Sequence, residues 1–438
     1  MRSMSSMSSM SSMSSRSKTA RRAGAIALSV ATVAGAAACS SSSSTASQQA
    51  ASSKQAITFA ISGLGAEGTY LEKQVKEFEA ANPNINVVVN VDSSNSTVFL
   101  SQINNSFAAG ASTPDLVESD VTYTAKWAAG GYLAPVSCSA SDFNSAMWST
   151  GTFQGKQYSC PFFLNTEGLW YRTDLIKTPP TTPQQVVTDA QAAMKADPKL
   201  KEGIAFEGDQ YEGEITSFMV LDKAFGGSLN NLSNISTPQN VAALDYLHSL
   251  IYQDKLAPAG VTSYTEGQTG DDFDSGYAAF AINWPYVASG PFSNGVTASD
   301  IGYIPFPAAS GGQPGVALGG SVLSINAKTA HIAAVNKLIA FLTTPAQQTA
   351  RAIAVSDAPA VLAAYNSQLF ANSALWKTVQ GLAADAAARP VSPYYLTVSA
   401  DLQEMISSAY ASSSPSAVTK AFSSYATTVA SDANPSGS

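Results

Sequence analysis

From residue 57 onwards, apolar runs alternate with stretches in which apolar positions recur every three or four residues. The run Ile57–Ile61 predicts a buried strand, and Leu71, Val75 and Phe78 share one face of a helix predicted from Glu67 to about residue 80. The alternation continues with strands over 85–91 and 115–118 and helices over 98–109 and 122–129. Because this order favours right-handed crossover connections, it predicts a parallel sheet covered by helices.

The second half of the chain repeats the pattern less regularly. We expect strands over 168–171, 203–206, 278–282, 301–304 and 322–325, helices over 182–195, 211–225, 238–253 and 330–342, and mostly helix from there to about residue 430. The glycine pairs at 311–312 and 319–320 predict loops. Two α/β lobes fit this pattern better than one large sheet. We place the first lobe at 56–163 and 284–343, the second at 164–283 and 344–430, and a disordered tail at 431–438.

One stretch, FDSGYAAFAINWPY, places a large aromatic side chain directly after a buried strand. The apolar residues 278–282 are followed by Asn283 and Trp284, and Pro285 ends the strand. In open α/β folds, ligands bind beyond the carboxyl ends of strands. An indole between Asn283 and Tyr286 suits a sugar, whose C–H faces pack on the ring while polar neighbours bind the hydroxyls. A core position is the alternative for Trp284.

The N-terminus has the features of an export signal. Basic residues Arg16, Lys18, Arg21 and Arg22 precede a short apolar segment, which leads to three alanines and Cys39. Small residues before a cysteine resemble a bacterial lipobox, so we expect residues 1–38 to be a lipoprotein-type signal peptide and Cys39 to carry the lipid. The Ser-rich stretch 39–55 would be a flexible tether. A plain cleavage site with an incidental cysteine is the alternative.

Composition and charge narrow the class of partner. Of the 438 residues, 45% are hydrophobic and 12% are charged, and the formal net charge is −8. Removal of residues 1–38, which hold five basic and no acidic residues, takes it to −13. An acidic chain argues against nucleic acid as the main partner and is compatible with a neutral or cationic ligand. No transmembrane segment is evident after the N-terminal signal.

Cys138 and Cys160 remain after the signal is removed. In an oxidising compartment, a disulfide between them is plausible and would contribute on the order of 3 kcal/mol through loop entropy. Two unpaired thiols are the alternative, because the sequence gives no distance between the residues.

Catalytic and metal-binding patterns are scarce. His248 and His331, the only histidines, lie on predicted helices without a partner at metal-ligand spacing, and we expect both at helix surfaces. Gly-x-Ser-x-Gly and phosphate-binding Gly-Lys-Thr motifs are absent. We therefore predict no metal, cofactor or catalytic residue. Asp120 and Glu212 could form a glycosidase pair or accept hydrogen bonds from sugar hydroxyls.

Seven segments, taken in order, resemble the family 1 extracellular solute-binding proteins of ABC sugar importers. They are KEFEAANPNINVVV, PDLVESDVTYTAKWAAGGYLAPV, GKQYSCPFFLNTEGLWYRTDLI, YEGEITSFM, FDSGYAAFAINWPY, LGGSVLSI and ARPVSPYY. The resemblance covers nearly all of residues 57–425, and its details suggest the maltose/trehalose-binding branch. It implies a periplasmic-binding-protein-like α/β fold, in which two lobes are joined by hinge crossovers and enclose a ligand cleft.

The resemblance also implies roles for individual residues. Asp120 would accept sugar hydroxyls from the first lobe and Glu212 from the second, while Asn165 lies at the first crossover, where the family often has Asp. Trp284 would stack on the sugar and Arg389 would donate to its hydroxyls. The remaining candidates are two glycines that let backbone amides approach the ligand and four weaker polar positions: Gly319, Gly320, Glu67, Ser94, Tyr211 and Tyr286.

These expectations describe a monomeric, membrane-anchored lipoprotein on the extracytoplasmic face. It would capture a disaccharide such as trehalose or maltose, or a related oligosaccharide, by lobe closure and deliver it to the transmembrane subunits of an ABC permease. Three alternatives stay open: a secreted carbohydrate-active enzyme that uses Asp120 and Glu212, a lipid-anchored adhesion or structural protein without a small ligand, and a protein that binds another neutral solute such as a polyol.

Overall fold

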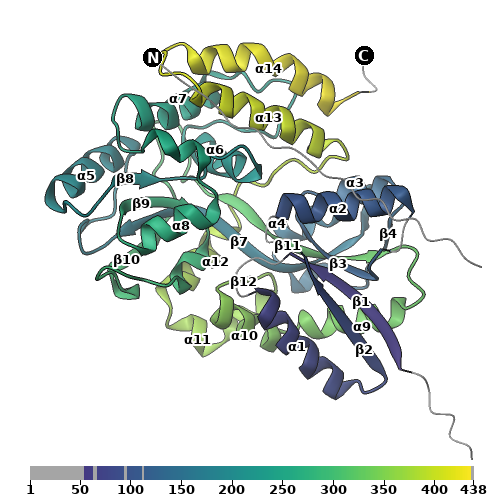
Figure 1. Ribbon diagram of the computed structural model, residues 1–438. Helices are drawn as coiled ribbons and strands as arrows, with labels where there is room; N and C mark the ends of the chain where they lie inside the picture. The colour runs from purple at the N-terminus through teal and green to yellow at the C-terminus, as the bar shows by residue number, and fades with distance from the viewer. Residues whose placement is uncertain (1–53, 63–66, 93–95, 111–112, 436–438) are drawn as a thin grey trace, which may run out of the picture. The chain divides into compact units, whose positions relative to one another are not determined.

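A computed structural model describes residues 54–62, 67–92, 96–110 and 113–435. The expected signal peptide, Cys39, nearly all of the tether, Ser94 and the last three residues lie outside these ranges. The first strands and helices lie where the apolar pattern predicts them (Figure 1). They are β1 (Gln55–Ile61), α1 (Glu67–Ala81), β2 (Ile85–Val91), α2 (Ser96–Ala109) and β3 (Leu116–Asp120). Strand β1 pairs in parallel with both β2 and β3, as predicted.

Two long strands continue this sheet in antiparallel orientation. Strand β11 (Ala317–Asn326) pairs with β3 on one side and with β7 (Ser159–Arg172) on the other. Beyond residue 167, β7 pairs instead with β9 (Ala278–Asn283) and β10 (Ile301–Ile304). With β8 (Glu202–Ala205), the order is β2-β1-β3-β11-β7-β9-β8, so the sheet is mixed rather than wholly parallel. In Figure 1, β7 and β11 lie between β1, β2 and β3 on one side and β8 and β9 on the other.

Two predictions about this region are wrong. Residues 168–171 were expected to form a short strand of their own, but they belong to one unbroken strand over 159–172. Gly319 and Gly320 lie inside β11 rather than in a loop. Gly320 has φ +116, and a Cβ there would lie 2.3 Å from the carbonyl oxygen of Phe163. The two glycines therefore allow a close strand approach with irregular register, for which their sequence gives the same signal as a turn.

The remaining elements complete the fold. Thr182 caps α5 through its side-chain oxygen, which accepts from the Gln185 amide at 3.1 Å, as predicted. The other helices and strands are α3 (Thr124–Ala129), β4 (Leu133–Ala134), α4 (Ser145–Thr150), β5 (Thr152–Phe153), β6 (Lys156–Gln157), α5 (Pro183–Ala196), β8 (Glu202–Ala205), α6 (Glu212–Ala224), α7 (Pro238–Tyr252), α8 (Glu266–Asp274), α9 (Ile332–Leu342), α10 (Pro345–Val355), β12 (Ala358–Pro359), α11 (Gln368–Ala371), α12 (Ala374–Ala383), α13 (Tyr395–Tyr410) and α14 (Ala417–Ala433).

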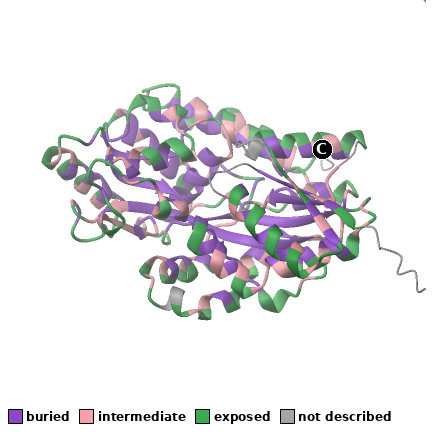
Figure 2. Ribbon diagram, turned by 60° about the horizontal axis from the view of Figure 1, so that its bottom comes forward, coloured by how far each residue is buried: buried purple, intermediate pink, exposed green. Residues whose placement is uncertain are grey.

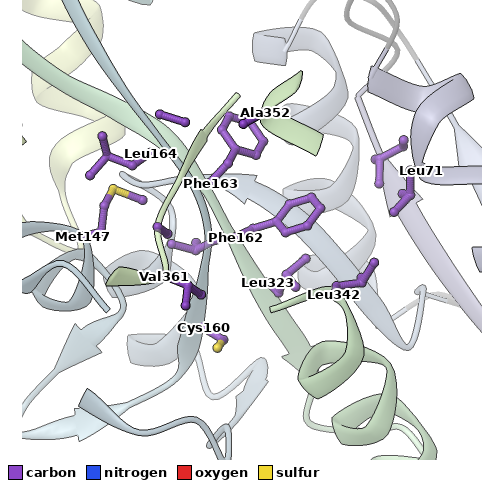
Figure 3. Packing of buried hydrophobic residues seen from close by; sticks show 14 of the residues in the cluster. Leu71, Met147, Cys160, Phe162, Phe163, Leu164, Leu323, Leu342, Ala352 and Val361 are labelled. Carbon is purple, nitrogen blue, oxygen red and sulfur yellow. The ribbon is translucent and has the colours of Figure 1, made fainter. Parts of the chain in front are cut away.

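Two large apolar clusters hold the described residues together. One gathers β1, β2, α1, α9, α10 and α12, and the other gathers β8, α5, α6, α7, α13 and α14. Figure 2 shows the buried strands between helices whose outer faces are exposed, and Figure 3 shows Phe162, Phe163 and Leu323 within the first cluster. Helices α10 and α12 thus pack with the first cluster, although the sequence grouped them with α13 and α14. The lobe boundaries themselves stay a prediction.

Cys138 and Cys160 are unlinked in this structure. Burial raises the pKa of the Cys160 thiol well above its ordinary value, and its hydrogen bond with Cys138 adds to the effect. The two thiols are therefore close together, and the disulfide stays a prediction. Within the described ranges, the helices are all too short or too polar to cross a membrane.

Candidate functional site

A cavity of about 130 Å³ collects most of the residues that the sequence singled out. Ser94 lies outside the described residues, and the other ten predicted ligand-binding residues all line the cavity: Glu67, Asp120, Asn165, Tyr211, Glu212, Trp284, Tyr286, Gly319, Gly320 and Arg389. They come from elements that are far apart in the chain, since Glu67 begins α1, Asp120 ends β3 and Glu212 begins α6. The structure thus brings these ten residues to one cavity, while their contact with a ligand stays a prediction.

Arg389 joins two carboxylates from opposite sides of the cavity. Its Nη2 donates to Asp120 Oδ2 at 2.8 Å and its Nη1 donates to Glu212 Oε1 at 2.9 Å. Other donors fix both carboxylates, because Thr122 donates to Asp120 at 2.6 Å and Tyr395 to Glu212 at 2.7 Å. The guanidinium is buried, and its fork geometry suits such paired contacts. We call this group the Arg389 bridge.

The indole of Trp284 lies against the backbone at Gly319. A Cβ at Gly319 would be 2.4 Å and 2.5 Å from two ring carbons of Trp284, so only glycine leaves room for the ring. Asn283 accepts from the Trp284 amide at 2.7 Å, and Trp170 donates to the Trp284 carbonyl at 3.1 Å. These contacts hold the backbone at the end of β9, so that a flat apolar surface lines the cavity.

Tyr211 and Tyr286 tie α8 to the site. The Tyr211 hydroxyl accepts from the Glu266 amide at 2.8 Å and donates to Glu207, and the Tyr286 hydroxyl donates to the Glu266 carbonyl at 2.6 Å. Glu266 itself lines the cavity. Burial raises the pKa of the Glu266 carboxyl to about 7, and the nearby Asp120 adds to this while Arg389 opposes it.

Three lining carboxyl groups were not predicted from the sequence: Glu118, Glu266 and Asp357. Glu118 lies two residues before Asp120 on β3, and an acidic residue inside an apolar strand is a signal that could have found it. Glu266 begins α8 and Asp357 follows α10, where neither position carries a local signal. Phe99 and Leu100 of α2 add apolar surface that was also missed.

Carboxyl groups outnumber cations around the cavity. Six line it: Glu67, Glu118, Asp120, Glu212, Glu266 and Asp357. Among the described residues that line the cavity, Arg389 is the only cation. Arg351 does not line the cavity, but its Nη2 lies 2.7 Å from Asp357 Oδ2. Both arginines are already paired with carboxylates, so an anionic ligand would find no unpaired cation among these residues. The site suits hydrogen-bond donors carried by a neutral or cationic ligand.

Metal binding and histidine chemistry find no support in the described part of the chain, where no group of three or more ligating side chains could hold a metal ion. His248 is buried rather than at a helix surface, and its Nε2 contacts the Ser412 carbonyl at 2.7 Å. His331 directly precedes α9 and is partly exposed. Neither histidine lines the cavity.

Comparison with known proteins places this geometry in a family. Residues 62–349 match the model of the family described as bacterial extracellular solute-binding protein. A probable ABC transporter-binding protein from Deinococcus radiodurans is 30% identical over 290 residues, which are 63% of this chain and 67% of the relative.

Two solved structures show how far the fold is shared. Maltose-bound MalE3 of T. maritima is 28% identical, with a TM-score of 0.75 over 87% of this chain and 98% of the other. A solute-binding protein from Agrobacterium radiobacter in complex with ribitol is 22% identical, with a TM-score of 0.73 over 85% of this chain and 98% of the other. The described sheet and helices thus have the two-lobed α/β fold of these binding proteins, as predicted. The chain belongs to the family of bacterial extracellular solute-binding proteins, which act on the extracytoplasmic side of the membrane.

Proposed function

We propose that this protein is the substrate-binding component of an ABC importer and captures a neutral sugar or polyol in the cleft around Trp284. The observation that carries the proposal is the composition of the cavity wall, where one indole face lies among six carboxyl groups and a paired arginine. Sugars and polyols offer C–H surface to an aromatic ring and many hydroxyl donors to carboxylates. The structural neighbours described above were solved with maltose and with ribitol, which belong to this chemical class.

The mechanism follows from the origin of the lining residues. Asp120 comes from β3 and Glu212 from α6, so a ligand that contacts both carboxylates beside Arg389 touches both sides. Closure about β7 and β11 would complete these contacts, and the ligand supplies the free-energy difference between the open and closed forms. A disaccharide such as trehalose or maltose is our preferred ligand, with an affinity of roughly −8 kcal/mol, in the micromolar range.

The cellular setting is part of the proposal. A lipid on Cys39 would hold the monomeric protein at the outer face of the membrane, where the closed form docks on the permease. The sequence also left open a glycosidase that uses Asp120 and Glu212. Both carboxylates are bound by the guanidinium of Arg389, and glycoside hydrolysis needs one such group free to deliver a proton. This arrangement favours binding over catalysis.

A thermal-shift screen tests the proposal. The purified protein is heated with trehalose, maltose, sucrose, maltotriose, mannitol and ribitol, and at least one of them should raise the melting temperature. Trp284→Ala and Asp120→Ala should abolish that shift. Trp376→Ala is the matched control for Trp284→Ala, because Trp376 is 8% exposed against 9% for Trp284 and lies outside the cavity lining. A screen in which no sugar or polyol stabilises the wild type would refute the proposal.

A further inference from the structure

A second group of charged side chains lies against the same cavity but on one side only. Arg351 of α10 is 1% exposed, and its Nη2 lies 2.7 Å from Asp357 Oδ2 and 3.7 Å from Glu67 Oε2. The guanidinium carbon lies 4.6 Å and 5.1 Å from the ring centroids of Phe162 and Phe163. The arginine is thus fixed by aromatic faces and an ion pair.

The carboxyl groups around Arg351 face the cavity while the arginine does not. Asp357, Glu67 and Glu118 line the cavity, whereas Arg351 is absent from its described lining. Ser321 donates to Glu118 at 2.7 Å. In contrast, Asp357 and Glu67 are not fully satisfied: Asp357 hydrogen-bonds with Glu67 and Asn165, while Glu67 Oε2 is buried and its closest charged partner, Arg351 Nη2, lies 3.7 Å away. Buried acceptors that lack a donor cost free energy, so a ligand hydroxyl that reaches Glu67 and Asp357 from the cavity would lower that cost.

The protonation of this group suits hydroxyl groups. Burial raises the pKa of the Glu67 carboxyl well above its ordinary value, and Asp357 adds to this while Arg351 opposes it. Burial also raises the pKa of Asp357, again opposed by Arg351. Burial thus favours the protonated form of both carboxyl groups, and a protonated carboxyl beside an ionised one presents both a donor and an acceptor. A hydroxyl group, which both donates and accepts, matches such a pair.

We propose that Asp357 and Glu67 form a second subsite of the cleft, which binds two adjacent hydroxyl groups of a neutral polyhydroxylated ligand. Asp357 and Glu67 touch the ligand, and Arg351 is a positioning residue that holds Asp357 from behind. This inference rests on the proposed function and deepens it, because it makes Asp357 a determinant of which sugar or polyol is bound. Asn165 lines the cavity beside this subsite, and its Oδ1 accepts from the Ala358 amide at 3.4 Å.

The test uses titration calorimetry to measure how the affinity changes when single hydroxyl groups are removed from the ligand. The wild type is titrated with maltose, trehalose, mannitol and ribitol, and then with the monodeoxy analogues of the tightest binder. Asp357→Asn should bind that probe about 10- to 100-fold more weakly. The deoxy analogues that lack the recognised hydroxyls should bind the wild type weakly but lose little further affinity in Asp357→Asn. A merely structural role would weaken every analogue equally.

Control variants distinguish a failure of the subsite from a failure of the proposed function. Asp174→Asn removes another carboxylate paired with an arginine, 2.5 Å from Arg172 and outside the cavity lining, and should bind the probe as the wild type does. Glu67→Gln keeps the Arg351–Asp357 pair and serves where Asp357→Asn does not fold. If Asp357→Asn and Glu67→Gln both bind the probe with wild-type affinity, the subsite is wrong and the proposed function stands. A matched amino sugar that binds the wild type more tightly than the neutral probe overturns the preference for hydroxyl groups. Absence of binding to every probe overturns the proposed function together with the subsite.

Discussion

Two arginines meet the same acidic cleft in opposite ways. Arg389 contacts Asp120 from β3 and Glu212 from α6, so its fork connects two sides of the cavity. Arg351 pairs with Asp357 and Glu67 and lies over the rings of Phe162 and Phe163, which belong to the first apolar cluster. We infer that Arg389 holds two sides of the cavity together, whereas Arg351 fixes the carboxyl groups of one side.

Replacement of Arg389 should have the largest effect. Arg389→Met leaves two carboxylates without a shared cation, and we expect the unfolding free energy to fall by about 3 kcal/mol, measured by urea denaturation. Because the bridge also joins the walls, the variant should show a larger radius of gyration in X-ray scattering without ligand. Arg351→Met should lose comparable stability with an unchanged radius of gyration. The same scattering change in both variants would contradict the comparison.

A methyl group at Gly319 should act through the indole. In Gly319→Ala the new Cβ meets the Trp284 ring at 2.4 Å, so the ring must move out of the place where it faces the ligand. We expect sugar binding to weaken about 10-fold in calorimetry and stability to fall by about 1–3 kcal/mol. Gly260→Ala is the control, since nothing lies within 4 Å of a Cβ there. Equal affinities in the two variants would show that the ring position does not matter.

Glu167 is a buried carboxyl group that pairs with neither Arg389 nor Arg351. Its ionisation should have a smaller effect, which depends on pH. It is fully buried in β7, where Ser217 donates to it at 2.8 Å, and burial raises its pKa from 4.5 to about 8. A raised pKa stabilises the folded protein below pH 4.5, and this contribution is lost as the pH rises through about 8. Glu167→Gln should therefore gain stability over the wild type by about 1 kcal/mol or more between acidic and alkaline pH.

Thermal unfolding across that pH range measures the gain. Glu72→Gln, at an exposed position of α1, should follow the wild type at every pH. A constant difference between Glu167→Gln and the wild type would mean that Glu167 does not titrate as proposed.

Sequence patterns predicted the elements that carry local signals. The strand before Trp284, the cap at Thr182 and the helix that begins at Glu212 all follow from apolar period, capping residues and proline. The cleft residues were assigned through family resemblance, and ten of them share the cavity. What escaped prediction depends on contacts between distant segments. Arg351 looks like one position of an amphipathic helix, and Asp357 like part of a loop, until the fold brings both to Glu67.

The glycines of β11 also show where prediction from local sequence fails. Gly319 and Gly320 carry the sequence signal of a turn, yet backbone pairing with β7 keeps them inside a strand. Only the tertiary position of Trp284 explains why a side chain is excluded at residue 319. Local propensity therefore gives way to tertiary packing where two strands and a ring meet.

The most direct test of the account is a crystal structure of the protein with the sugar or polyol that stabilises it most. The account predicts ligand density against the Trp284 ring, with hydroxyl groups within hydrogen-bonding distance of Asp120 or Glu212 and of Asp357. A ligand that lies elsewhere, or that leaves both the indole and these carboxyl groups untouched, would contradict it.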